Sequence, residues 1–247
     1  MPPEVSQRSL YDDDAIPKAA VHQHEAGWAD EKLSNCGAVT GSARIQQLAR
    51  LANERLPDLK NHDRIGRRIE FVDYHPAYHE LMGAATKTEG HGLPWTTTEK
   101  RPQVARAAMS CMCYQAEAGV MCPTGMSFSI VRLLRSDPEI GNQWFDKFLS
   151  TGYDPQPIPA DPKQSVTTAM SMTEKQGGSD PRANTSRAVP TGNDREYLST
   201  GHQYSCSVPM GDLILLAAQT RAGVTLFLAP RTLPDGARNA IRVQRLN

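Results

Sequence analysis

The sequence has no long apolar run and no excess of charge of either sign. Its longest apolar stretch, residues 213–219, has only the length of a β-strand, whereas a membrane-spanning helix needs roughly 20 apolar residues. The 27 basic and 27 acidic side chains give a formal net charge of +0. Proteins that bind nucleic-acid phosphates or anionic membranes normally carry a basic excess. We therefore expect neither a membrane span nor DNA as a partner of this chain.

Cysteine is also scarce, with five residues and no disulfide-framework spacing. Cys111, Cys113 and Cys122 lack the Cys-x-x-Cys spacing of zinc sites, and His75 and His79 have no third ligand nearby in the sequence. We interpret the cysteines as reduced packing thiols and His75 as a helix cap, and we predict no metal site. The N-terminus is polar and acidic, unlike a secretory leader. These features together predict a cytoplasmic protein.

The pattern of apolar residues predicts an α+β chain, in which an α-helical N-terminal domain is followed by a middle β-domain. Residues 1–36 are predicted to be a loosely structured arm with one short helix near residues 16–28. Residues 37–160 form the predicted helical domain, with helices over 42–55, from His75 onward, over 102–120, over 124–135 and around Trp144. A connector with prolines at 155, 157, 159 and 162 follows the last of these helices and marks the domain boundary. Residues 161–247 form the predicted β-domain, with strands over 165–172, 196–206, 213–218, 224–228 and 240–246.

The stretch Met172 to Asp180 is the most informative part of the sequence for function. It places two adjacent glycines, two hydroxyl groups and two carboxylates directly after a predicted strand. Glycines let the backbone approach a ligand closely, and successive N–H groups can hold an anion. Taken alone, this pattern is more often a simple turn. It matches neither the GxGxxG dinucleotide fingerprint nor a P-loop.

With its neighbours, this stretch resembles the flavin loop of the acyl-CoA dehydrogenase family, and the chain is similar to the AidB-like, alkylation-response branch of that family. The segments that carry the resemblance occur in order along the chain: residues 48–53 (LARLAN), 66–68, 74–82 (YHPAYHELM), 117–123, 172–180, 201–209 (GHQYSCSVP) and 233–242. The family fold has an N-terminal helical domain, a middle β-domain and a C-terminal helical bundle. By this resemblance, the chain is expected to lack the C-terminal bundle.

The resemblance also implies a set of FAD-binding residues. Thr173 and the Met172 backbone match positions against the flavin ring, while Gly178 and Ser179 match positions near the cofactor phosphate. A second flavin strand is implied at Tyr204, Ser205, Cys206 and Ser207. The candidate set is completed by Met170, Ser171, Glu174, Lys175, Gln176 and Gly177. Tyr204 stands where the family usually has Trp, and Ser171 stands where it prefers Gly, Ala or Cys, which implies a looser and more polar flavin wall.

The function implied is that of an FAD-binding acyl-CoA dehydrogenase-like oxidoreductase, with an acyl-CoA as the candidate substrate and a link to DNA alkylation. The family's glutamate base lies in the C-terminal bundle, so no residue of this chain is predicted to be catalytic. Glu174 is interpreted as structural. Cys206 is open to two interpretations, an oxidisable thiol beside the flavin or an inert packing residue. Two alternatives remain for the whole chain: a non-catalytic flavin-binding or interaction module, and an inactive fragment. A homo-oligomer is compatible with either.

Overall fold

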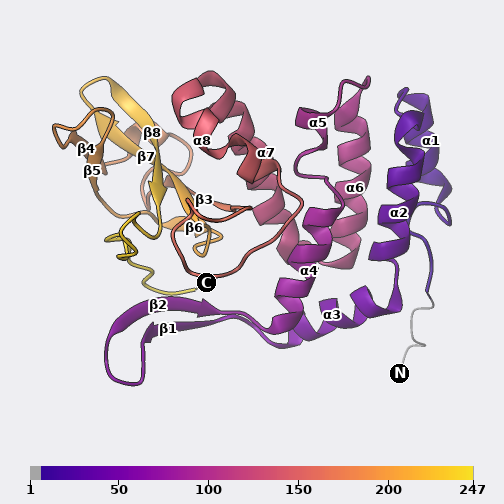
Figure 1. The fold of residues 1–247 in the computed structure, drawn as a ribbon, viewed down its shortest axis with the longest axis horizontal. Helices are drawn as coiled ribbons and strands as arrows, with labels where there is room; N and C mark the ends of the chain where they lie inside the picture. Colours follow the sequence, from indigo (N-terminus) through magenta and orange to yellow (C-terminus); the bar gives the residue numbers. More distant parts are fainter. Residues whose placement is uncertain (1–6, 247) are drawn as a thin grey trace.

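The computed structural model describes residues 7–246, and Figure 1 shows a helical part and a β-sheet part side by side. The helices are α1 (Ala15–Gln23), α2 (Asp30–Thr40), α3 (Ala43–Glu54), α4 (Pro76–Lys87), α5 (Leu93–Thr96), α6 (Pro102–Ala116), α7 (Met121–Ser136) and α8 (Pro138–Leu149). Short 3-10 turns occupy Gly27–Ala29, Ala118–Val120 and Pro181–Ala183. A separate two-stranded hairpin, β1 (Asp58–His62) and β2 (Arg68–Asp73), projects from the helical part.

Polar side chains fix where several helices begin. Asp14 accepts a hydrogen bond from the Ile16 N–H at the start of α1, and Ser42 caps α3 by accepting from Ile45. His75 Nδ1 accepts from the Ala77 N–H and is followed by Pro76, so it caps α4 as the sequence predicted. Each cap satisfies an N–H group that the helix itself cannot pair.

The sheet is mixed and has the order β5-β4-β7-β3-β6, with β8 paired to the other side of β7. Its strands are β3 (Thr168–Thr173), β4 (Arg187–Pro190), β5 (Tyr197–Thr200), β6 (Ser205–Ser207), β7 (Leu213–Thr220) and β8 (Gly223–Pro230). β7 runs parallel to β3 and antiparallel to β8. β7 is nearly continuous in apolar residues because it lies at the centre of the sheet.

Buried apolar side chains join the helices to the sheet. One cluster combines Ile130 and Val131 of α7 and Phe148 of α8 with Leu213 and Leu215 of β7. Burial of an aromatic or aliphatic side chain contributes roughly 1.5–3 kcal/mol, so this cluster holds β7, and through it β3, against α7 and α8. Two further clusters lie within the helices, one around α1, α2 and α6 and one between α3 and α4.

The structure corrects several sequence-based expectations. The short helix predicted near residues 16–28 is present as α1, but a loosely structured arm is wrong for the described part of residues 1–36, because most of α2 also lies there and Val21 and Leu33 are fully buried; residues 1–6 lie outside the described residues. The predicted strand over 240–246 is absent, and these residues are irregular. The predicted strand over 196–206 is two short strands, β5 and β6. The hairpin β1–β2 and the strand β4 were not predicted.

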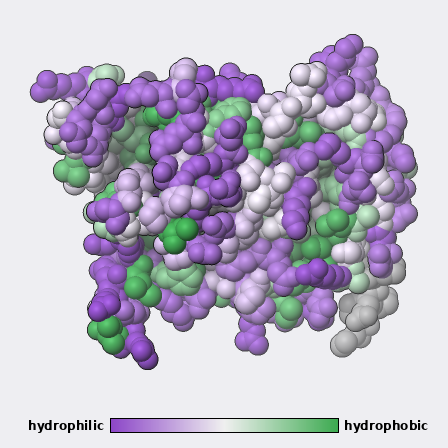
Figure 2. Space-filling view, in the orientation of Figure 1, coloured by the Kyte–Doolittle hydropathy of each residue, from purple (hydrophilic) through white to green (hydrophobic). Residues whose placement is uncertain are grey.

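Hydrophilic side chains cover most of the face in Figure 2, with smaller hydrophobic areas over the hairpin and the sheet. Ile65, in the turn between β1 and β2, is 64% exposed, and Leu198 of β5 is 63% exposed. No helix in residues 7–246 is both long enough and apolar enough to cross a membrane.

Candidate cofactor-binding site

The two segments that the sequence singled out lie next to each other in the sheet. β6 pairs antiparallel with β3, so that Met170 faces Ser207 and Thr173 faces Ser205. The Tyr204 N–H donates to the Thr173 carbonyl at 3.0 Å, which extends the contact past the end of β6. Because β6 ends the strand order beside β3, the Tyr204–Ser207 segment has a free edge. The structure thus brings the two ends of the predicted site together.

Glu174 anchors the loop that follows β3. The Glu174 residue is 4% exposed. It accepts hydrogen bonds from the Thr185 N–H at 2.9 Å, the Thr185 hydroxyl at 2.8 Å and the Ser186 N–H at 2.6 Å. Burial raises the pKa of Glu174, but the bonds from Ser186 and Thr185 outweigh burial and lower the pKa to about 2. The carboxylate therefore stays ionised and points inward, as expected for a structural residue.

Asn184 completes this support of the loop. Its side-chain N–H donates to the Met172 carbonyl at 2.9 Å. A Cβ atom at Gly177 would lie 2.2 Å from Asn184 Oδ1, so this close approach requires glycine. Sequence reasoning missed Asn184, Thr185 and Ser186, because no local pattern connects them with the Met172 carbonyl and the Glu174 carboxylate, eleven or twelve residues earlier. Only the tertiary fold reveals that relation.

The remaining predicted residues divide between the interior and the surface. Ser171 is buried, and its hydroxyl hydrogen-bonds to Cys206, whose pKa is raised chiefly by burial. Met170 and Met172 pack against the cluster between the sheet and α7–α8. Solvent reaches the other members of the predicted set, which are Lys175, Gln176, Gly178, Ser179, Tyr204, Ser205 and Ser207.

The outward-facing groups suit a flavin nucleotide. The hydroxyl groups of Thr173, Ser179, Ser205 and Ser207 make no hydrogen bond to any residue within 7–246. The Tyr204 side chain is 51% exposed, which leaves an aromatic ring beside the free edge. A Cβ atom at Gly178 would meet no atom within 4 Å, so a phosphate has room to approach the backbone there. The donors and the open backbone therefore fit FAD.

A second cluster, of aromatic side chains, was not predicted. The rings of Tyr74 and Tyr78 stack at 4.2 Å, and His79 Nδ1 lies 2.9 Å from the Tyr153 hydroxyl. These four residues line a small cavity of about 50 Å³ beside the start of β3. Burial lowers the pKa of His79 and raises that of Tyr153. The four-residue spacing of Tyr74, just before α4, and Tyr78 on α4 was a visible signal, but Tyr153 lies about 75 residues later, just before the proline connector, and could not be connected with them.

No group of three potential metal ligands occurs within the part of the chain that the structure describes. His75 is used as a cap and His79 contacts Tyr153.

The arrangement of helices and sheet defines the class of protein. The fold is similar to that of two solved structures. The first, Caenorhabditis elegans ACDH-11 in complex with C11-CoA, matches with a TM-score of 0.81 and 22% identity, over 98% of this chain and 44% of that one. The second, Bd2924 in an apo form, matches with a TM-score of 0.83 and 19% identity, over 98% of this chain and 50% of that one. The chain therefore has the fold of the N-terminal and middle domains of acyl-CoA dehydrogenases.

Sequence comparison identifies the family within this class of fold. The family described as adaptive response protein AidB N-terminal domain matches residues 1–155. AidB of Escherichia coli (strain K12), whose name assigns it to the acyl-CoA dehydrogenases, is 40% identical over 247 residues, which are 99% of this chain and 46% of that protein. The chain belongs to the AidB family, and it spans about half the length of this curated relative.

Proposed function

We propose that this chain binds FAD along β3 and β6 as part of an AidB-like acyl-CoA dehydrogenase flavoprotein. The observation that carries the proposal is the pairing of Thr173 with Ser205, which places the two predicted flavin segments side by side. Sequence-distant segments that converge with free donors are a stronger indication of a site than either segment alone.

Each candidate residue has a proposed role. The Thr173 hydroxyl and the backbone at Met172 would bind the ring system, and Tyr204 would pack on it. The open backbone at Gly178 and the Ser179 hydroxyl would hold the phosphates. Glu174 would bind no ligand and would instead keep the loop in shape, because Thr185 and Ser186 already occupy its carboxylate. A bound flavin supplies the redox step by accepting a hydride.

Acyl-CoA thioesters are the proposed substrate class. The support is membership in the AidB family and the similarity to a fold whose solved complex contains C11-CoA. Family membership alone supports a role in the response to DNA alkylation. A cytoplasmic location is proposed on the five free cysteines, since reduced thiols are usual in that compartment. The domain division at the proline connector, near residue 160, also remains a proposal.

The proposal is tested by visible absorbance of the purified chain after incubation with excess FAD and desalting. We expect a retained flavin band that is lost in the double variant Thr173→Ala/Ser179→Ala. The matched control is Ser199→Ala/Thr200→Ala, which removes two exposed hydroxyls from β5 at the opposite end of the strand order. The control should retain the band. Loss of the band in both variants, or its absence from the unchanged chain, would refute FAD binding at this site.

Addition of an acyl-CoA separates binding from turnover. Glu174 is the buried carboxylate of the loop, and its low pKa and full set of donors make it unsuited to proton abstraction. We therefore expect the flavin of this chain to stay oxidised in the presence of an acyl-CoA. Bleaching of the flavin band would instead support a base among the residues of this chain and contradict the assignment of Glu174.

A further inference from the structure

The cavity between α4 and the start of β3 is lined by aromatic rings in two orientations. The rings of Tyr74 and Tyr78 are stacked and nearly parallel, with an interplanar angle of 16°. The His79 ring stands at 73° to both of them, with centroid distances of 6.0 Å and 5.7 Å. The Tyr153 ring lies roughly parallel to His79, at 25° and 5.9 Å. Two nearly perpendicular sets of rings therefore line one cavity.

The cavity has room for a compact head group. Its volume is about 50 Å³, and a single water molecule needs about 10–15 Å³ of such free volume. The cavity therefore holds about four water molecules, or one compact group with as many non-hydrogen atoms, such as a trimethylammonium. The four rings are partly exposed rather than buried, so a ligand reaches them from solvent.

The charged residues that line the cavity, Asp154 and Asp212, are both acidic, and no lysine or arginine of residues 7–246 lines it. Asp212 already accepts hydrogen bonds from Lys163 Nζ at 2.7 Å and from the Thr167 N–H at 2.9 Å. Asp154 accepts one from the Gln156 N–H at 2.9 Å. The lining thus offers negative charge more than free acceptors. A cation without N–H groups suits it best, because buried N–H groups without partners cost free energy.

The aromatic rings of the cavity are neutral near neutral pH. Burial raises the pKa of Tyr78 and of Tyr153, and it lowers the pKa of His79. His79 therefore adds no positive charge that would repel a cation. The face of a neutral aromatic ring attracts a cation within about 6 Å of its centroid, and the centroid distances among these rings are of that size.

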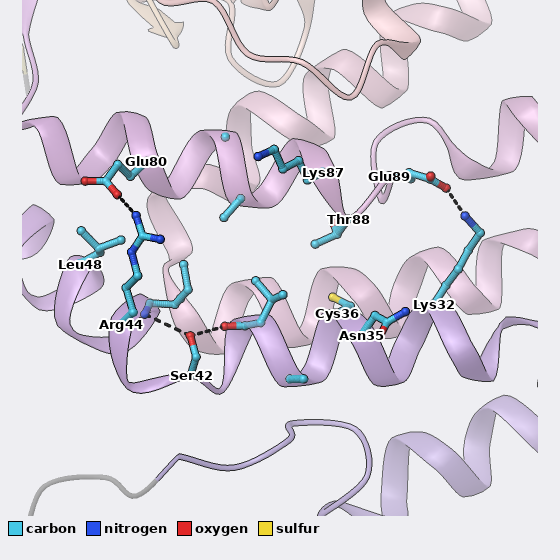
Figure 3. A pocket seen from close by; sticks show the side chains of 15 residues that line it. Lys32, Asn35, Cys36, Ser42, Arg44, Leu48, Glu80, Lys87, Thr88 and Glu89 are labelled. Carbon is cyan, nitrogen blue, oxygen red and sulfur yellow. Dashed lines mark hydrogen bonds and ion pairs between the residues drawn. The ribbon is translucent and has the colours of Figure 1, made fainter.

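The larger groove of the molecule lacks these properties. It has a volume of about 840 Å³ and lies between α2, α3 and α4 (Figures 1 and 3). Its charged side chains are of both signs and form two ion pairs, Lys32 with Glu89 and Arg44 with Glu80. Within residues 7–246, no aromatic side chain lines it. Selectivity for a cation is therefore a property of the aromatic cavity and not of the groove.

We propose that the aromatic cavity binds a small molecule with a trimethylammonium head group. The methyl groups would pack against the rings of Tyr78 and Tyr153, and Asp154 would supply the opposite charge. The remainder of the molecule would extend toward solvent.

The cavity is separate from the proposed flavin site. Thr167, which precedes β3, and Val208, which follows β6, line the cavity. Thr173 and Ser205 pair at the opposite end of the same two strands. A test of cation binding therefore needs no flavin, and its failure would leave the FAD proposal untouched.

The test is isothermal titration calorimetry of the full chain with choline chloride at constant ionic strength. The matched ligand is 3,3-dimethyl-1-butanol, which has the shape of choline with an uncharged carbon in place of the nitrogen. We expect saturable choline binding in the millimolar range and binding of the neutral ligand weaker by about tenfold. Equal affinity for the two ligands, or no saturable binding of choline, would overturn the proposal. A trimethyl-lysine peptide that binds where choline does not would also overturn it, by assigning the cavity to a peptide.

Variants test whether the rings and the charge hold the ligand. Tyr153→Leu removes a ring and should weaken choline binding about tenfold, whereas Tyr153→Phe keeps the ring and should bind within about twofold. Asp154→Asn keeps every ring and should weaken choline binding about threefold, without affecting the neutral ligand. The matched control Tyr114→Leu, at a tyrosine of α6 that is 64% exposed, should change nothing. Unaltered choline affinity in both Tyr153→Leu and Asp154→Asn would contradict the proposal, and the Asp154 variant decides alone if Tyr153→Leu folds poorly.

Discussion

Replacing Glu174 by Gln tests whether the loop after β3 is held by a buried charge. The carboxylate accepts from two backbone N–H groups and one hydroxyl of Thr185 and Ser186, and from the side-chain amide of Gln176. Glutamine keeps the shape but replaces one acceptor oxygen by an N–H₂ group that faces N–H donors. At least one buried donor then loses its partner, and the remaining bonds lose their charge assistance.

The expected magnitude follows from both the hydrogen bonds and the titration. Loss of hydrogen bonds to a buried charged group costs roughly 2–4 kcal/mol. The same hydrogen bonds lower the pKa from 4.5 to about 2, which corresponds to about 3 kcal/mol of folding free energy at about 1.4 kcal/mol per pKa unit. Because the folded-state pKa is the lower one, this contribution is complete above pH 4.5 and disappears as the pH falls through 2.

The assay is chemical denaturation at pH 7 and at pH 3, followed by tryptophan fluorescence and far-ultraviolet circular dichroism. Trp144 packs in the cluster that joins α7 and α8 to the sheet, so its emission reports on that contact. We expect Glu174→Gln to lower the free energy of unfolding by about 3 kcal/mol at pH 7 and by about 1 kcal/mol at pH 3. Glu99→Gln, a change to an exposed carboxylate, should alter it by less than about 0.5 kcal/mol. A Glu174→Gln variant as stable as the control at pH 7 would refute the anchoring role.

Two further substitutions test the packing beneath the site. Lys163 Nζ lies 2.7 Å from the carboxylate of Asp212 in an ion pair that is almost wholly buried. Lys163→Met removes this partner, and we expect the free energy of unfolding to fall by about 3–5 kcal/mol in the same denaturation assay. The control Lys175→Met, at an exposed lysine, should lower it by less than about 0.5 kcal/mol. Gly211→Ala would place a Cβ atom 2.4 Å from a backbone nitrogen of β3. This overpacking should cost about 1–3 kcal/mol of unfolding free energy and thereby lower the thermal midpoint. The open position Gly178 should accept Ala with an unchanged midpoint, and equal midpoints for the two glycine variants would contradict this account.

The sequence predicted the helices well because their signals are local. The helix predicted over 42–55 is α3, and the one predicted from His75 is α4, which His75 caps as predicted. The prediction failed where tertiary contacts decide. Residues 1–36 were assigned to an arm with one short helix because of their prolines and polar side chains, yet α1 and α2 are held by burial of Tyr11, Val21 and Leu33 against α6.

In the C-terminal segment, by contrast, the sequence predicted a strand that the structure does not contain. Residues 240–246 alternate in a way that is typical of a strand, but no neighbouring strand pairs with them. Arg238 Nη2 instead donates to the buried carboxylate of Glu70 at 2.7 Å, which ties this segment to the hairpin. Burial raises the pKa of Glu70, but its bonds to Arg238 and Arg68 lower it below the usual value. A period-two pattern of apolar residues favours an extended backbone, but the segment forms a strand only if a free sheet edge can pair with it.

The position of the candidate site was predictable because a family signature marks it. Which residues of the site face a ligand and which face inward could not be predicted. The signature places a carboxylate, two glycines and several hydroxyls in one loop, without saying which of them face a ligand. The structure separates them, because Glu174 and Gly177 face inward onto residues 184–186 while Thr173 and Ser179 keep free hydroxyls. A general base works best with a pKa near the working pH, and a carboxylate with a pKa of about 2 lies far from it. The same hydrogen bonds that shape the loop for binding thus remove its carboxylate from proton transfer.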